Sequence, residues 1–208
     1  MTPSRLTRRF YARPTLELAQ ALLGHWLCRR VGGAVRRGRI VEVEGYTDDQ
    51  ASHARARRRT PRNAVMFGPA GHMYVYFTYG MHHCANVVAE HDGEPGAVLI
   101  RGLDGIAGAN GPARVCRALA IDRQLDGADL TTSDALWIAR GRRRHGEVVI
   151  QTTRIGIRTA TDLPWRFYLA GSAGVSRPDH RAEAERSFRT DRNRRARNAR
   201  PRPASRSV

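Results

Sequence analysis

The chain contains no lysine, because all 36 of its strongly basic residues are arginines. Only the N-terminal amine could therefore form a Schiff base with a substrate, which disfavours enzymes that work through one. Acidic residues are also scarce, 19 among 208, and the formal net charge is +17. A surplus of this size usually indicates an anionic partner such as nucleic acid, although a compositional bias toward arginine could produce part of it.

Cysteines and long apolar runs are equally rare. Cys28, Cys84 and Cys116 are far apart and form no C-x-x-C pair, which predicts buried thiols in a reducing compartment rather than a disulfide framework or a zinc site. No run of about 18 apolar residues occurs, so we expect no membrane span. The basic first residues lack the apolar stretch of a signal peptide. These absences predict a cytoplasmic protein, at the nucleoid in a bacterium or in the nucleus of a eukaryote.

The length predicts one folded domain with a distinct C-terminal end. Residues 181–208 contain ten arginines and three acids but no Leu, Ile or Trp, which is typical of a disordered basic tail. Residues 1–180 remain basic without this tail, and we expect them to form the domain.

Apolar spacing and turn residues predict few helices and several hairpins. Helices are expected at 15–23 and 112–121, and strands at 26–31, 39–46, 73–78, 84–89, 97–103, 148–157 and 166–169. Gly32-Gly33 and Tyr79-Gly80 would form hairpin turns. This order favours an α+β fold, a single mixed domain built on an antiparallel sheet.

An unusual strand face lies in the segment Arg39-Ile-Val-Glu-Val-Glu-Gly-Tyr46. Alternate residues of a strand share a face, so Glu42, Glu44 and Tyr46 would point the same way. This pattern fits a solvated face with arginine partners, or a general base beside an aromatic platform.

Aromatic residues also gather in Met73-Tyr-Val-Tyr-Phe-Thr-Tyr-Gly-Met81. Tyr74 and Tyr76 share a strand face, and Tyr74 is most simply a core residue. Tyr79 would lie at an exposed hairpin tip, where an aromatic ring could be a wedge between stacked bases. The adjacent His82, His83 and Cys84 would point to alternate sides of a strand, so we expect no metal site there.

A series of short segments then occurs in a fixed order, and together they resemble the alkyladenine DNA glycosylase family, the 3-methyladenine DNA glycosylases of the human alkyladenine type. The match extends from about Leu6 to Pro178. It comprises Arg39–Tyr46, Ala51–His53, Thr60–Asn63, Met66-Phe67, Tyr74–Met81, Cys84–Asn86, Val98–Arg101, Gly111-Pro112, Cys116, Ala118–Ile121 and Arg166–Tyr168.

The resemblance implies a fold and an activity. The fold would be one mixed domain around a curved antiparallel sheet, with a β-hairpin that protrudes into the minor groove. The enzyme would flip a damaged purine out of duplex DNA and hydrolyse its N-glycosidic bond as a monomer, without cofactor or metal. Expected substrates are alkylated purines such as 3-methyladenine and 7-methylguanine, with hypoxanthine or ethenoadenine as further candidates.

The resemblance also implies residue roles. Glu44 would activate the water, and Arg101 would hold that water and Glu44. A backbone carbonyl near Ile155 would hold the water as well. The flipped base would lie among the side chains of Tyr46, His53, Tyr76 and Asn86. Asn86 would exclude the amino group of normal guanine. DNA contacts outside the pocket would come from Tyr79, which fills the gap left by the flipped nucleotide, and from Met81 and Arg62.

The chemistry of these residues agrees with such roles. An alkylated purine is cationic and favours the electron-rich faces of tyrosines, and Arg101 would keep a carboxylate ionised in a dry pocket. Three alternatives stay open from the residues alone. They are a non-enzymatic nucleic-acid-binding module, a metal-dependent nuclease using Glu42, Glu44, Asp48 and Asp49, and a bifunctional glycosylase with lyase activity, which the lack of lysine disfavours.

Overall fold

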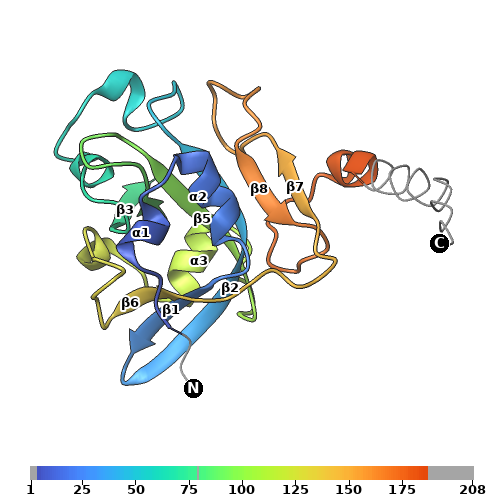
Figure 1. The fold of residues 1–208 in the computed structure, drawn as a ribbon, viewed down its shortest axis with the longest axis horizontal. Helices are drawn as coiled ribbons and strands as arrows, with labels where there is room; N and C mark the ends of the chain where they lie inside the picture. Colours follow the sequence, from blue (N-terminus) through green and yellow to red (C-terminus); the bar gives the residue numbers. More distant parts are fainter. Residues whose placement is uncertain (1–3, 79, 187–208) are drawn as a thin grey trace, which may run out of the picture.

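A single curled antiparallel sheet organises the protein. The computed structural model describes residues 4–78 and 80–186, and within them eight strands form one sheet. Six of them pair in the order β3-β4-β5-β2-β1-β6, β8 also pairs with β2, and β7 pairs with β8. Figure 1 shows the sheet curving around the helices. The strands are β1 (Trp26–Val31), β2 (Ala34–Tyr46), β3 (Met73–Thr78), β4 (His82–Val88), β5 (Ala97–Asp104), β6 (Leu136–Ala139), β7 (Val149–Thr152) and β8 (Arg166–Leu169).

Strand β2 is the longest element and connects two different environments. Its first four residues are exposed and the next eight are buried. It pairs with β1 at the exposed end and with β5 and β8 toward the buried end. The register shifts between Ile40 and Val43, and a bulge of this kind bends a strand and redirects its side chains. Glu42 and Glu44 lie where β2 pairs with two neighbouring strands, β5 and β8.

Three short α-helices cover the inner face of the sheet (Figure 1). They are α1 (Arg8–Tyr11), α2 (Thr15–Leu22) and α3 (Pro112–Ala118), and the 3-10 turns are η1 (Arg55–Arg57), η2 (Ala64–Phe67) and η3 (Arg123–Leu125). Helix α2 buries the apolar side chains of Leu18, Ala19 and Leu22 in the main core. A Cβ on Gly45 would lie 2.6 Å from the Leu16 side chain, so this glycine lets the helix approach β2 next to Glu44.

The fold class predicted from the sequence is confirmed: one mixed domain with a curled antiparallel sheet and few helices. Strands β1, β3 and β8 begin and end as predicted. The prediction of a strand over 148–157 is wrong in its second half, because β7 ends at Thr152 and the chain then leaves the sheet to cover Glu44. Strand β6 was not predicted, since its four residues carry too little alternation to be distinguished from a loop.

The two ends of the described chain add little to the sheet. Residues 180–186 are helical, as Figure 1 shows at its right-hand side. The rest of the predicted basic tail, residues 187–208, lies outside the described residues. None of the helices described in 4–78 and 80–186 is long and apolar enough to cross a membrane. The three cysteines are buried and free, as expected.

Candidate active site

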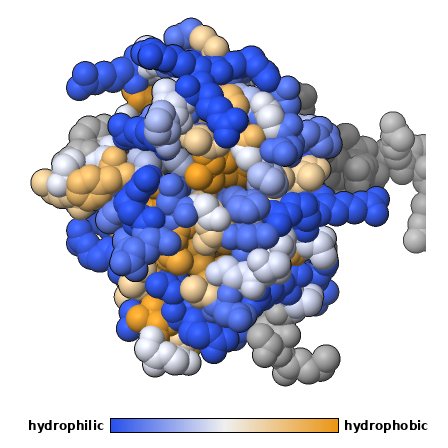
Figure 2. Space-filling view, turned by 90° about the vertical axis from the view of Figure 1, so that its left-hand side faces the viewer, coloured by the Kyte–Doolittle hydropathy of each residue, from blue (hydrophilic) through white to orange (hydrophobic). Residues whose placement is uncertain are grey.

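A pocket of about 650 Å³ opens at the end of the sheet where β2 finishes. Strands β3, β4 and β5 form its floor, and the loops that follow β2 and β7 form its walls. Hydrophilic side chains cover most of the face seen in Figure 2, with apolar residues visible in its central part. The pocket is lined by Tyr46, Gln50, Ala51, Ser52, His53, Arg55, Met66, Tyr74, Tyr76, Thr78, Cys84, Asn86, Ala97, Leu99, Arg101, Pro112, Ile155, Gly156, Ile157, Arg158 and Thr159.

The carboxylate of Glu44 lies directly behind this lining and is fully buried. Its Oε2 accepts hydrogen bonds from the Tyr46 hydroxyl at 2.8 Å and from Arg101 Nη1 at 3.3 Å. Its Oε1 accepts one from the backbone N–H of Ile155 at 2.8 Å. All three donors line the pocket. Since a carboxylate oxygen can accept two hydrogen bonds, Oε1 retains an acceptor position.

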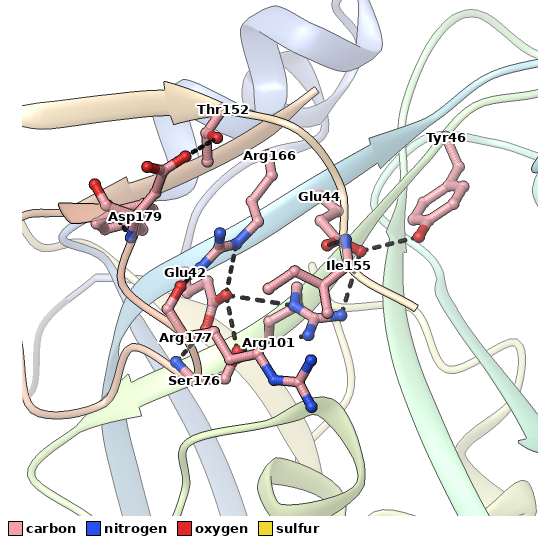
Figure 3. A network of polar contacts seen from close by, with 11 residues as sticks. Glu42, Glu44, Tyr46, Arg101, Thr152, Ile155, Arg166, Ser176, Arg177 and Asp179 are labelled. Atoms are coloured by element: carbon pink, nitrogen blue, oxygen red, sulfur yellow. Dashed lines mark hydrogen bonds and ion pairs between the residues drawn. The ribbon is translucent and has the colours of Figure 1, made fainter. Parts of the chain in front are cut away.

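A second buried carboxylate stands behind the first (Figure 3). Glu42 Oε1 accepts from Arg166 Nε at 2.8 Å and from Arg101 Nε at 3.3 Å. Ser176 donates to the same carboxylate through its backbone N–H at 2.7 Å and its hydroxyl at 2.9 Å. Arg101 therefore bridges both glutamates. The expectation that Glu42 lies on a solvated face is wrong, because both carboxylates are completely buried. The expectation that it has arginine partners is correct.

Two adjacent backbones make room for this network. A Cβ on Gly102 would overlap the carbonyl oxygen of Gly174, and one on Gly174 would overlap the backbone of Leu103. Only hydrogen atoms at both positions allow the segment before Ser176 to lie against β5. This close approach brings the Ser176 donors onto Glu42.

Burial raises the pKa of Glu44 above its usual value. Arg101, the Ile155 N–H and the Tyr46 hydroxyl all oppose this shift, because each stabilises the ionised form. Arg101 thus acts in the direction expected from the sequence, but burial outweighs it. A carboxylate whose pKa is raised is a stronger proton acceptor than an exposed one.

Aromatic rings form the opposite side of the pocket. The rings of His53 and Tyr76 meet edge to face with centroids 4.4 Å apart, and Tyr74 lies 5.4 Å from Tyr76. A hydrogen bond of 2.8 Å joins His53 Nδ1 to the Tyr74 hydroxyl. Partial burial and the nearby Arg62 lower the pKa of His53, which favours the neutral form of its ring. Asn86 donates to the Tyr74 carbonyl oxygen at 3.0 Å and is thereby fixed at the pocket wall.

The wall above Glu44 is built around Arg154. Its guanidinium pairs with Asp49 at 2.7 Å, donates to the Gly45 carbonyl oxygen at 3.0 Å, and lies 4.7 Å from the centre of the Tyr46 ring. Burial alone would raise the pKa of Asp49, but the hydrogen bonds from Arg154 lower it overall. This buried ion pair ties the loop after β7 to the loop after β2, and it places the Ile155 N–H on Glu44.

The predicted DNA contacts lie around the β3–β4 hairpin. Met81 is 69% exposed. Arg62 donates to the Phe77 carbonyl oxygen at 3.2 Å, and its guanidinium lies 5.9 Å from the Tyr76 ring centre. Tyr79, the predicted wedge, lies outside the described residues. The structure thus brings Glu44, Arg101, Tyr46, His53, Tyr76 and Asn86 to one pocket and places Arg62 against Tyr76.

Several residues of the site were not identified from the sequence. Tyr74 was interpreted as core, and it is buried, but its hydroxyl also binds His53 at the pocket. Asn63 is 1% exposed and was noted only as part of a motif. Its side chain donates to the His53 and Arg58 carbonyl oxygens and accepts from Thr60, so it fixes the loop that carries His53. An asparagine that closes the turn-like segment Thr60-Pro-Arg-Asn63 is the sequence signal that could have identified it.

Comparison with known proteins decides the family. The family model described as "Methylpurine-DNA glycosylase (MPG)" matches residues 9–173. The chain belongs to the methylpurine-DNA glycosylase family. A relative from Synechococcus elongatus is 52% identical over 181 residues, which cover 84% of this chain and 92% of the relative. One from Carboxydothermus hydrogenoformans is 46% identical over 189 residues, covering 83% and 98%. Both bear the name "Putative 3-methyladenine DNA glycosylase".

Membership of the methylpurine-DNA glycosylase family confirms the resemblance seen in the sequence, and it indicates a DNA glycosylase, a hydrolase of DNA repair. The alternative of a metal-dependent nuclease has little support. Within residues 4–78 and 80–186, no three His, Cys, Asp or Glu side chains are grouped so that they could hold a metal ion. Three of its four carboxylates are instead paired with arginines: Glu42, Glu44 and Asp49.

Proposed function

We propose that this methylpurine-DNA glycosylase removes alkylated purines such as 3-methyladenine and 7-methylguanine from duplex DNA by hydrolysis, leaving an abasic site. Hypoxanthine and ethenoadenine are further candidate substrates. The enzyme acts in the cytoplasm as a monofunctional, cofactor-free monomer. The absence of lysine supports hydrolysis over a Schiff-base lyase, because no side-chain amine is available to attack the sugar.

One observation carries the proposal: a fully buried carboxylate, Glu44, is held behind the pocket by three donors that themselves line it. A water at the remaining acceptor position of Oε1 would give up a proton to Glu44 as its oxygen attacks C1′ of the flipped nucleotide. The bond from C1′ to the purine nitrogen breaks, and its electron pair leaves with the base. A cationic alkylated purine becomes neutral as it leaves, so it needs no proton from the enzyme.

The pocket walls support selection of the base. Tyr76 and Tyr46 offer electron-rich faces, and each cation–π contact contributes about 0.5–2 kcal/mol toward a cationic purine. A neutral His53 ring, which the lowered pKa favours, would not repel that cation. Asn86, fixed by its bond to Tyr74, stands where it would meet the edge of the base and exclude the amino group of normal guanine.

The β3–β4 hairpin supports a role in flipping. We propose that Tyr79 fills the gap left by the nucleotide, with Met81 beside it and Arg62 on a phosphate. Tyr79→Ser should then weaken binding to damaged duplex and slow single-turnover excision. An unchanged affinity and rate would exclude this role. Flipping costs a few kcal/mol, and least for weakly paired bases, so part of the selectivity would precede the pocket.

The decisive experiment is a single-turnover assay on a methylated duplex, with chelator present. Released base is followed by chromatography, and strand breaks are scored before and after alkali. We expect base release with breaks only after alkali. Glu44→Gln should abolish release and leave duplex binding unchanged, because it keeps the shape of the side chain and removes the proton acceptor.

Glu17→Gln is the matched control, since it makes the same chemical change on the exposed side of α2. It should excise at the wild-type rate. Normal excision by Glu44→Gln would remove this residue from the mechanism. DNA binding without release from any methylated duplex would favour the remaining alternative, a non-enzymatic binding module with the same fold.

A further inference from the structure

The outer face of β1, β2 and β6 carries a feature that the pocket does not use. Cys28, Trp137 and Ala139 form a small buried cluster separate from the main core, and the partly buried Trp26 packs against it. Arginine side chains cover it. The guanidinium of Arg37 lies 5.1 Å from the Trp26 ring centre, and that of Arg30 lies 5.8 Å from Trp137. We call these four residues, Trp26, Trp137, Arg30 and Arg37, the arginine–tryptophan face.

The charges of Arg30 and Arg37 are not neutralised within the described part of the chain. None of its ion pairs includes either side chain. The nearby acids Asp134 and Glu147 instead pair with Arg5 and Arg39. Both stacked arginines are exposed. Arg30 donates through Nε to the Asp134 carbonyl oxygen at 3.2 Å. The planar fork of a guanidinium matches phosphate oxygens.

More positive charge adjoins this face. Strand β6 pairs with β1 and is followed by Arg140, Arg142, Arg143 and Arg144, all exposed. The carbonyl oxygen of Arg142 accepts a hydrogen bond from Arg39, which pairs across the ladder with Trp26. No acid occurs between residues 18 and 41 of the sequence. This surface is therefore suited to a polyanion.

The arginine–tryptophan face is remote from the pocket. Arg37 and Tyr46 lie nine residues apart on β2, which corresponds to about 30 Å along an extended strand. In Figure 1 the β1–β2 hairpin reaches the bottom of the molecule, whereas the loops that wall the pocket lie at the top. A duplex whose nucleotide enters the pocket therefore binds at the end of the domain opposite to the arginine–tryptophan face.

We propose that the arginine–tryptophan face binds the phosphate backbone of a second DNA duplex while the pocket end holds the first. Charge complementarity supports this occupant, because unpaired guanidinium groups bind phosphodiesters without regard to sequence. One molecule would then hold two DNA segments together. This binding is independent of excision and does not require the proposed chemistry.

The test uses the full chain and two lesion-free duplexes, one carrying a donor and the other an acceptor fluorophore. Energy transfer on addition of protein reports that the duplexes are held together. The variant Arg30→Gln/Arg37→Gln removes the stacked charges. Its matched control is Arg9→Gln/Arg117→Gln, which removes two exposed arginines from α1 and α3. Excision from a single methylated duplex is measured separately.

We expect energy transfer with the wild type and the control, and a variant that holds the second duplex about an order of magnitude less tightly at 0.2 M salt. The slope of log affinity against log salt should fall by about 1.8, from about 0.9 per phosphate contact. Excision from one duplex should be unchanged. If excision fails in every form but energy transfer behaves as stated, only the proposed activity is lost.

Four outcomes would overturn the proposal. The wild type could fail to join two duplexes, or the variant could join them as well as the control does. The variant could lose single-duplex binding and excision in equal measure, which would make the face part of the first DNA track. Polyglutamate could displace the second duplex more strongly than unlabelled DNA at equal charge, which would assign the face to an acidic protein segment.

Discussion

Removal of the guanidinium that Glu42 and Glu44 share should make stability depend on pH. Arg101 donates to both carboxylates, each at 3.3 Å. Arg101→Met keeps an unbranched side chain of similar length and removes the charge. Two fully buried carboxylates then remain, of which Glu42 keeps its ion pair with Arg166.

The size of the effect follows from the cost of an uncompensated buried charge. Breaking a buried ion pair by removing one partner costs about 3–5 kcal/mol. We expect the lower end, about 3 kcal/mol at pH 7, because Arg166 still accompanies Glu42 and because Glu44 can take up a proton. For a domain of this length, that loss corresponds to a decrease in Tm of roughly 6–12 °C.

The direction of the pH dependence follows from Glu44. Arg101 lowers the pKa of this carboxyl, so its removal raises the folded-state pKa further above the unfolded value. Such a group favours the folded state below its unfolded pKa, and this contribution is lost as pH rises through the folded pKa. The deficit of Arg101→Met relative to wild type should therefore be smaller at pH 5 than at pH 8.

Urea unfolding of both proteins at pH 5, 7 and 8 measures this deficit. The double variant Arg101→Met/Glu44→Gln serves as control, because it removes the unpaired charge and should recover at least about 1 kcal/mol at pH 8. An equal deficit at pH 5 and 8, or no recovery in the double variant, would refute the electrostatic account and leave a loss of packing as the explanation.

Three further predictions follow from the site. Single-turnover excision of a cationic purine should fall as pH decreases, because only the ionised form of Glu44 accepts a proton. The midpoint of a pH–rate profile should lie above pH 4.5, since burial raises the pKa of Glu44, and a midpoint at or below 4.5 would contradict this. Tyr74→Phe removes the bond to His53 and should slow excision about fivefold, the equivalent of about 1 kcal/mol; an equal rate would show that this bond does not position the ring. Gly102→Ala should lower the free energy of unfolding by about 1–3 kcal/mol, since the new methyl overlaps Gly174; thermal unfolding measures this, and an unchanged Tm would show that the segment shifts freely.

The sequence was informative wherever periodicity and charge coincide. The two-residue repeat from Arg39 to Tyr46 predicted a strand with both glutamates on one face, and β2 has that arrangement. The ordered motifs led to the family. The antiparallel sheet followed from hairpins with turn residues between them, because such turns are local and depend on few neighbours.

What the sequence did not reveal depends on contacts between distant segments. The apolar alternation of 148–157 indicated a strand, but its second half leaves the sheet because Arg154 pairs with Asp49 and the Ile155 N–H bonds to Glu44. Neither contact has a local signature. The burial of Glu42 likewise could not be predicted, because its partners Arg166 and Ser176 lie far along the chain and only the folded sheet brings them together.

The long sequence separations within this network affect how the protein folds while it is synthesised on the ribosome. Glu42 and Glu44 leave the exit tunnel early, but Ile155 follows Glu44 by 111 residues and Ser176 follows Glu42 by 134. Throughout most of translation the two carboxylates therefore remain hydrated, since burial without their partners would be too costly. The candidate active site can form only when almost the whole domain has been made, so a nascent chain stalled before residue 176 carries an unfinished site.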